Sequence, residues 1–398
     1  MALAKFWRMH GSQTLVVLAV FSLVGAGAYG QLSYDPDVEP YLPEALPEAA
    51  SFELLLSEPA EGSYLYVASD GNGHQLGYIT ATEGQGYGGP MTVMVTWSLE
   101  GTILSVQVPE HHDTPAWYGK LFEKEFFSQY IGRQYSQPLM LDEDIDAASG
   151  ATHSSTGVAT GVQAGRQLVS EQLSDPYLAP EEPISFGTAE IMLLVGLGTV
   201  VGFRMLPALR KRHWLRYFTL LFGFIVLGVW LSSPLSLVNF AIWPVGFAPS
   251  WQSNLFLYIL VFGLVALAIF FAKNFWCFWL CPFNAIQEGM HFVGGSRVRT
   301  ITKRQLLLRN TRYVILWLVL LIVLIMRNPS LSVFEPWNTL FSFKGNAEQW
   351  LLLVVVLGVA MFIYDFWCHY LCPVGATMDI ILKVRMWFVD GFGRLFAR

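Results

Sequence analysis

Six apolar runs dominate this sequence and limit the folds that are open to it. An α-helix needs about 20 apolar residues to cross the hydrocarbon core of a membrane. The first and fifth runs reach that length only together with their flanks. The runs lie near Thr14–Tyr29, Ile184–Met205, Trp214–Leu231, Leu255–Trp276, Tyr313–Met326 and Trp350–Trp367. The sequence therefore predicts an all-α membrane part with about six transmembrane helices.

The charged residues divide the chain into two different halves. Residues 30–187 carry 23 of the 30 acidic side chains and four basic ones. Residues 188–398 carry 18 basic and 7 acidic side chains, together with most of the apolar runs. This division predicts a soluble acidic domain inserted in a membrane protein. It argues against a nucleic-acid-binding protein, and four cysteines are too few for a secreted disulfide scaffold.

We expect three parts along the chain. Residues 1–30 form an N-terminal transmembrane anchor, residues 31–183 an exported domain with proline-rich linkers, and residues 184–398 a membrane domain of five helices. The small residues Gly25 to Ala28 also fit the end of a cleaved signal peptide. That alternative stays open, and the acidic domain is exported in either case.

The basic residues of the short loops indicate how the chain crosses the membrane, because such loops are usually cytoplasmic. The clusters are Lys5 and Arg8, Arg204 to Arg216, Arg297 to Arg312, and Lys383 to Arg398. With six spans they all lie on one side, which places both termini in the cytoplasm and the acidic domain outside. The loop 297–312 either contacts anionic lipid or docks an acidic ferredoxin-like partner.

One motif occurs twice, at a constant offset of 91 residues. The segments 275–285 and 366–376 are identical at seven of eleven positions, and both contain Cys-x-x-x-Cys-Pro. Each copy ends an apolar run that descends toward the cytoplasm, so we predict a repeated two-helix unit. The repeat contains all four cysteines of the chain, Cys277, Cys281, Cys368 and Cys372.

The cysteine pairs predict a metal centre near the cytoplasmic face. Cysteines four residues apart lie on one face of a helix, and the following proline limits the continuation of that helix. Four thiolates suit iron, an iron–sulfur cluster or zinc, and we favour a redox-active iron centre. A disulfide fits this spacing poorly. His369 is interpreted as a packed or interfacial residue, and b-type haem is disfavoured.

The exported domain combines strands and helices and is therefore predicted to be α+β. Thr92–Trp97 and Ile103–Val108 flank a turn and predict a β-hairpin. Helices are expected over Trp117–Ile131 and about Gly157–Leu173, the second with Ser154, Ser155 or Thr156 as its N-cap. A turn of small residues precedes that helix, and free backbone N–H groups at a helix N-terminus favour a phosphate.

The turn Asp146-x-x-Ser149-Gly150-Ala151-Thr152 resembles the flavinylation signature of FMN-binding domains in Rnf, in the sodium-pumping quinone reductase and in NosR/NirI-type regulators. The resemblance implies FMN joined through its phosphate to Thr152 by a separate flavin transferase, with Ser149, Gly150 and Ala151 beside it. Asp113 and Ala116 depart from the usual Glu-Thr-Pro-Gly element. Tyr87, Thr114 and Tyr118 are candidates for holding the flavin ring.

The membrane part resembles the NosR/NapH/CcoG polyferredoxin region, without the C-terminal ferredoxin tail usual in that family. Together the resemblances imply a component of a redox complex in the bacterial inner membrane, with its FMN domain in the periplasm. It would transfer electrons between a cytoplasmic ferredoxin-like or quinol donor and a periplasmic acceptor, rather than act as a stand-alone enzyme. A redox-sensing regulator and a structural component with a zinc site remain alternatives.

Overall fold

The structure is a computed structural model. It describes residues 2–33, 37–58, 62–86, 90–111, 113, 115–141, 143–149, 151–175, 184, 186–206, 209, 214–252, 254–295, 309–343 and 345–396. The chain forms two compact units. Unit 1 contains residues 1–181 and 323–331, and unit 2 contains residues 182–322 and 332–398.

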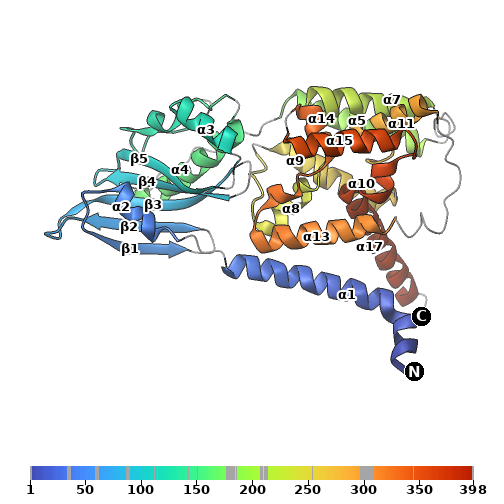
Figure 1. Ribbon diagram of the computed structural model, residues 1–398, viewed down its shortest axis with the longest axis horizontal. Helices are drawn as coiled ribbons and strands as arrows, with labels where there is room; N and C mark the ends of the chain where they lie inside the picture. The colour runs from blue at the N-terminus through green and yellow to red at the C-terminus, as the bar shows by residue number, and fades with distance from the viewer. Residues whose placement is uncertain are drawn as a thin grey trace. The chain divides into compact units, whose positions relative to one another are not determined.

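Unit 1 is built on a five-stranded antiparallel sheet in which neighbours in sequence are neighbours in space (Figure 1). The strands are β1 (Ser51–Glu58), β2 (Ser63–Ser69), β3 (Gln75–Gln85), β4 (Pro90–Ser98) and β5 (Ile103–His111). Strands β4 and β5 pair with Val95 opposite Val106. Gly101 lies in the connecting turn with φ 78°, a conformation that favours glycine. The predicted hairpin is confirmed.

Within residues 1–181 of unit 1 the helices are α1 (Ala2–Ser33), η1 (Glu39–Tyr41), α2 (Leu42–Ala45), α3 (Pro115–Glu123), η3 (Phe126–Tyr130) and α4 (Thr152–Gln172). The continuous helix predicted over residues 117–131 is wrong. Glu125 adopts φ 50°, a left-handed conformation that an α-helix does not continue through. This residue separates α3 from the short 3-10 helix η3.

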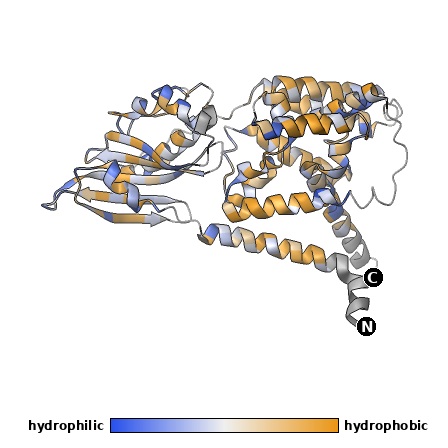
Figure 2. Ribbon diagram, in the orientation of Figure 1, coloured by the Kyte–Doolittle hydropathy of each residue, from blue (hydrophilic) through white to orange (hydrophobic). Residues whose placement is uncertain are grey.

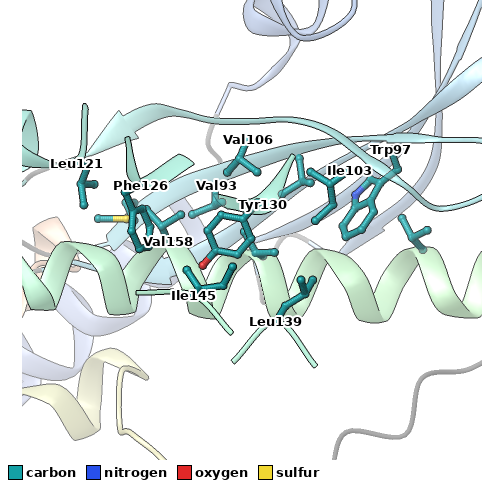
Figure 3. Close-up of a cluster of buried hydrophobic side chains, with 14 of the residues drawn as sticks. Val93, Trp97, Ile103, Val106, Leu121, Phe126, Tyr130, Leu139, Ile145 and Val158 are labelled. Atoms are coloured by element: carbon teal, nitrogen blue, oxygen red, sulfur yellow. The ribbon is translucent and has the colours of Figure 1, made fainter. Parts of the chain in front are cut away.

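Helix α4 packs against the sheet because small residues let the two approach closely. A Cβ atom added at Gly161 would lie 2.5 Å from the Cβ of Val93. The Thr82 hydroxyl of β3 donates a 2.7 Å hydrogen bond to the carbonyl of Gly161. Figure 3 shows the core between these elements, which includes Val93, Trp97, Ile103, Val106, Leu121, Phe126, Tyr130, Leu139, Ile145 and Val158. The predicted α+β class of this part is confirmed.

The remaining helices are, in chain order, α5 (Thr188–Met205), α7 (Trp214–Phe222), η4 (Gly223–Trp230), α8 (Val238–Val245), α9 (Leu255–Tyr258), η5 (Ile259–Gly263), α10 (Leu264–Phe271), α11 (Pro282–Gly294), α13 (Thr311–Met326), η6 (Pro329–Ser332), α14 (Pro336–Ser342), α15 (Ala347–Ala360), α16 (Phe366–Tyr370) and α17 (Pro373–Phe396). Hydrophobic residues cover most of these helices (Figure 2). Unit 2 has its own core of aromatic and aliphatic side chains, centred on residues such as Trp276, Trp337 and Trp367.

The structure supports fewer membrane spans than the six that the sequence predicts. Among the described residues, two helical stretches are long and apolar enough to cross a membrane, Thr14–Leu32 and Thr188–Met205. A bent pair, α14 with α15, would make a third. In the apolar run that begins at Leu255, the helix ends at Phe271, because Ala272 adopts φ 55°. The chain leaves helical geometry there, shortly before the first cysteine motif.

Candidate flavin and iron–sulfur sites

The first cysteine motif forms a tight turn in front of a helix. Residues 277–280 are a turn, and Cys281 is the N-cap of α11. The Trp276 carbonyl accepts hydrogen bonds from the backbone N–H groups of Leu280, at 2.9 Å, and Cys281, at 3.0 Å. Pro282 is the first residue of α11, a position that suits proline because its φ is already helical and no N–H is needed.

The second motif repeats this arrangement. Cys368 lies in the short helix α16, and Cys372 directly precedes α17, which begins at Pro373. The Trp367 carbonyl accepts hydrogen bonds from the N–H groups of Leu371, at 2.9 Å, and Cys372, at 2.8 Å. The expectation that each pair lies on one helix that ends at the proline is therefore wrong. The proline begins the next helix instead.

All four cysteines line one cavity of about 170 Å³ in unit 2. None of them is in a disulfide, and Cys372 is buried. Among the described residues, no three His, Cys, Asp or Glu side chains are arranged to hold a single metal ion. Four cysteine sulfurs are a donor set that proteins use for an iron–sulfur cluster or for a zinc ion.

Polar side chains also line this cavity or contact its cysteines, and the sequence did not single out Asn284 and Gln287 among them. Asn284, Arg312 and His369 are part of its lining, and the Arg312 guanidinium forms an ion pair with Asp379. Gln287 contacts the sulfur of Cys368. The Nδ1 atom of His369 lies 3.1 Å from the carbonyl of Asp365.

A larger apolar pocket of about 730 Å³ adjoins the same helix, α11. Its lining includes Tyr217, Leu220, Leu221, Phe224, Ile286 and Phe292, with Glu288, His291 and Tyr364 as polar members. The Glu288 carboxylate forms an ion pair with Arg216. It also accepts hydrogen bonds from the Tyr364 hydroxyl, at 3.3 Å, and from Asn284 Nδ2, at 3.3 Å. Asn284 therefore joins this pocket to the cysteine cavity.

In unit 1 the small-residue turn leads directly into α4. Helix α4 begins at Thr152, with Ala151 as N-cap and no side-chain cap. The prediction that Ser154, Ser155 or Thr156 is the N-cap is therefore wrong. Ser155 instead lies inside the first turn, where its hydroxyl accepts the Ala148 N–H at 3.0 Å and donates to the Ala151 carbonyl at 3.1 Å. These bonds fix the turn, and they leave Ser149 exposed.

Asp113 of the Asp-Thr-Pro element contacts the helix that follows the flavin motif. It is buried, and its carboxylate accepts a hydrogen bond from the buried hydroxyl of Ser154. A Cβ atom added at Gly86 would lie 2.6 Å from the same carboxylate. The sequence marked Asp113 as a departure from the usual glutamate. The structure shows that its side chain binds α4.

Tyr118 is a buried aromatic residue of α3 in the same unit. Its ring stacks on that of His111, with 3.6 Å between ring centroids. Burial, and secondarily the charge of Asp113, raise the pKa of Tyr118 to about 12. Tyr118 also lines a cavity of about 320 Å³ together with Phe122 and Phe127, so planar side chains are available there for an aromatic ligand.

The other predicted flavin residues are described less completely. Tyr87, Thr114 and Gly150 lie outside the described residues, and at Thr152 only the backbone is described. Ala151 is buried. Of the three residues proposed to hold the flavin ring, the structure therefore describes Tyr118.

Comparison with known families assigns a cofactor type to each unit. Residues 86–167, which include the flavin motif, match the family described as an FMN-binding domain. Residues 253–300 and 350–394, with one cysteine pair in each, match the family described as a 4Fe-4S binding domain. The chain therefore has the domains of a flavin and iron–sulfur protein.

Individual relatives narrow this class. The chain is 26% identical to a regulatory protein NosR of Stutzerimonas stutzeri over 224 residues, which are 51% of this chain and 30% of that protein. It is 28% identical to the protein NirI of Paracoccus denitrificans over 181 residues, 41% of this chain and 26% of that protein. Together with the two family matches, these relatives confirm the predicted resemblance to NosR/NirI-type flavoproteins.

A further relative is named as part of a redox complex. It belongs to a proton-translocating ferredoxin:NAD(+) oxidoreductase complex of Clostridium ljungdahlii, and it is 24% identical over 110 residues, which are 26% of this chain and 59% of that protein. The aligned parts cover less than a third of the NosR and NirI proteins.

Proposed function

We propose that this protein carries electrons between a cytoplasmic or quinone-level donor and a periplasmic acceptor, through a cysteine-bound iron–sulfur cluster and covalently bound FMN. It acts as the electron-transfer component of a redox complex. The observation that carries the proposal is the single cavity lined by all four cysteines of the two repeated motifs. A resemblance of both units to cofactor-binding families supports it.

The cysteines at the start of α11 and α17 would hold the cluster, with Cys277 and Cys281 from one repeat and Cys368 and Cys372 from the other. Iron–sulfur clusters are held by cysteine thiolates, and they accept and release single electrons. Both helices point their N-termini toward the cysteines that precede them. The positive end of the helix dipole favours a negatively charged cluster there.

Thr152 would bind FMN through a phosphoester that a separate flavin transferase forms, with Ser149, Gly150 and Ala151 around the phosphate. The first backbone N–H groups of a helix have no partner within the helix and favour a phosphate. Thr152 is the first residue of α4, which supports this assignment. Tyr87, Thr114 and Tyr118 would hold the flavin ring.

The apolar pocket beside α11 favours a quinol among the possible donors. Its volume of about 730 Å³ lies within the usual range of about 300–1,000 Å³ for small-molecule pockets. Apolar walls suit the ring and tail of a quinol, and Glu288 and His291 are polar groups to which its hydroxyls could bind. Asn284 contacts Glu288 and lies 3.8 Å from the sulfur of Cys368, so the pocket lies close to the proposed cluster.

The proposal includes a place in the cell and partners. The FMN domain would be periplasmic and the basic loops cytoplasmic, in a protein that crosses the bacterial inner membrane several times and contacts its lipids. Two apolar helices and the division of charges between the halves of the chain support this. The name of the Clostridium ljungdahlii relative, as part of an oxidoreductase complex, supports association with other redox subunits.

Rapid mixing of the purified full-length protein with a quinol, under anaerobic conditions, tests the proposal. We expect the quinol to bleach the FMN absorption on the timescale of turnover. In Cys368→Ser, FMN should remain bound but should no longer be reduced by quinol, because the path through the cluster is lost. Equal rates of FMN reduction in the two proteins, or no reduction in the wild type by quinol or reduced ferredoxin, would contradict the proposal.

A further inference from the structure

Gln287 makes a two-sided contact with the second cysteine motif. Its side chain is fully buried, with 0% of its surface exposed. The Nε2 atom lies 2.9 Å from the sulfur of Cys368, and Oε1 accepts the backbone N–H of Trp367 at 2.9 Å. A side chain from a helix of one repeat thus contacts a cysteine of the other.

The Trp367 N–H fixes which end of the amide faces the sulfur. A backbone N–H can only donate, so the oxygen of the Gln287 amide must face it. The NH₂ group must then face Cys368, whose sulfur is the acceptor. The hydrogen-bond partners therefore determine the orientation of the amide.

The two repeats differ at this position. With the offset of 91 residues, Gln287 of α11 corresponds to Met378 of α17, which is also fully buried but has no N–H to donate. A backbone donor to sulfur is present in both copies, from the Gly375 N–H to Cys372 at 3.2 Å and from the Asn284 N–H to Cys281. The side-chain amide is therefore specific to the first repeat. Packing does not require it, because the second repeat buries a methionine at the same position.

We propose that Gln287 is a positioning residue that raises the reduction potential of the cluster by donating an N–H···S hydrogen bond to Cys368. The inference rests on the proposed function, since it requires a cluster at the four cysteines. A reduced cluster carries one more negative charge, part of it on the cysteine sulfurs. A donor to sulfur stabilises that state more than the oxidised one, and burial strengthens the effect.

Two variants separate the hydrogen bond from a merely structural contact. Gln287→Glu keeps an oxygen to accept the Trp367 N–H but replaces the donor by a carboxylate. Gln287→Met has a similar length, loses both bonds and reproduces the residue of the second repeat. Gly289→Ala, on the same helix, is the matched control, because a Cβ atom added at Gly289 meets no atom within 4 Å.

Redox titration of the full-length protein, followed by electron paramagnetic resonance of the reduced cluster, tests the inference. At a fixed potential, Gln287→Met should lower the ratio of reduced to oxidised cluster about tenfold. This change corresponds to a midpoint potential that is lower by about 59 mV for one electron. Gln287→Glu should lower it at least as much, and Gly289→Ala should leave it unchanged. Unchanged midpoints in both Gln287 variants, with the cluster intact, would overturn the inference and leave the proposed function standing.

A measurement on the wild type keeps the inference testable if neither variant assembles a cluster. Protein labelled with ¹⁵N in its glutamine side chains should show a nitrogen coupled to the reduced cluster in pulsed electron paramagnetic resonance. Absence of this coupling would overturn the inference. A wild-type protein that contains no iron would overturn the proposed function and the inference with it.

Discussion

Thr152 begins the helix that packs against the sheet of unit 1, and the small-residue turn before it is fixed by Ser155. If Thr152 is the site of flavin attachment, Thr152→Ala should abolish the fluorescent flavin that stays on the protein after denaturation. The reason is that alanine has no hydroxyl to form the phosphoester. The measurement is fluorescence of the protein band on a denaturing gel.

Thr160→Ala provides the matched control for this prediction. Thr160 is an exposed threonine of the same helix, and its hydroxyl bonds to the carbonyl of Thr156. This variant should keep its fluorescent band. A band of unchanged intensity in Thr152→Ala would remove the assignment of the attachment site.

Single residues differed in how far the sequence could predict them. The grouping of the four cysteines was predictable because the motif occurs twice, and in the structure all four line one cavity. Gln287 was not predictable, because a glutamine outside the motif has no pattern, and its contact with Cys368 depends on how the two repeats pack. The contact between Asp113 and Ser154 joins residues 41 positions apart, which spacing cannot show.

Helix α4 depends on a glycine for its close packing against the sheet. In Gly161→Ala, the added methyl group would lie 2.5 Å from the Cβ of Val93, and both residues are buried. Overpacking of this kind typically costs about 1–3 kcal/mol, which exceeds the gain of up to about 1 kcal/mol from helix propensity. We therefore expect unit 1 to unfold at a lower midpoint temperature in the full-length variant. The measurement is thermal unfolding of the full-length protein, monitored by flavin fluorescence.

Gly119→Ala is the control for this change, since a Cβ atom at Gly119 of α3 meets no atom within 4 Å. It should leave the midpoint unchanged or raise it slightly. A midpoint for Gly161→Ala at or above that of the wild type would contradict the close packing described for α4 and β4.

Secondary-structure elements were predictable where local patterns decide them. The alternating residues of β4 and β5 gave the hairpin correctly. The prediction that each cysteine pair lies on one helix was wrong, because spacing alone cannot tell whether a proline limits one helix or begins the next. In the structure, Cys277 lies in a turn and Cys368 in the short helix α16, and a new helix begins after each motif, at Pro282 and Pro373.

The molecule as a whole combines unit 1, which contains the match to the FMN-binding family, with unit 2, in which four cysteines line one cavity. Unit 1 contains residues 323–331 as well as residues 1–181, and a division by charge along the sequence cannot show such a return of the chain. The predicted number of about six membrane spans is not confirmed, and apolar composition alone does not show where the chain breaks a helix. Ala272 and Asp365 both adopt left-handed conformations, and each lies a few residues before a cysteine motif.

The central claim is that the four cysteines together bind one iron–sulfur cluster. The most direct test is the iron, zinc and acid-labile sulfide content of the anaerobically purified full-length protein and of its four single Cys→Ser variants. The family described as a 4Fe-4S binding domain predicts four iron and four sulfide ions per chain, with a clear loss in every variant. One zinc ion per chain without sulfide, or full iron content in all four variants, would contradict the claim.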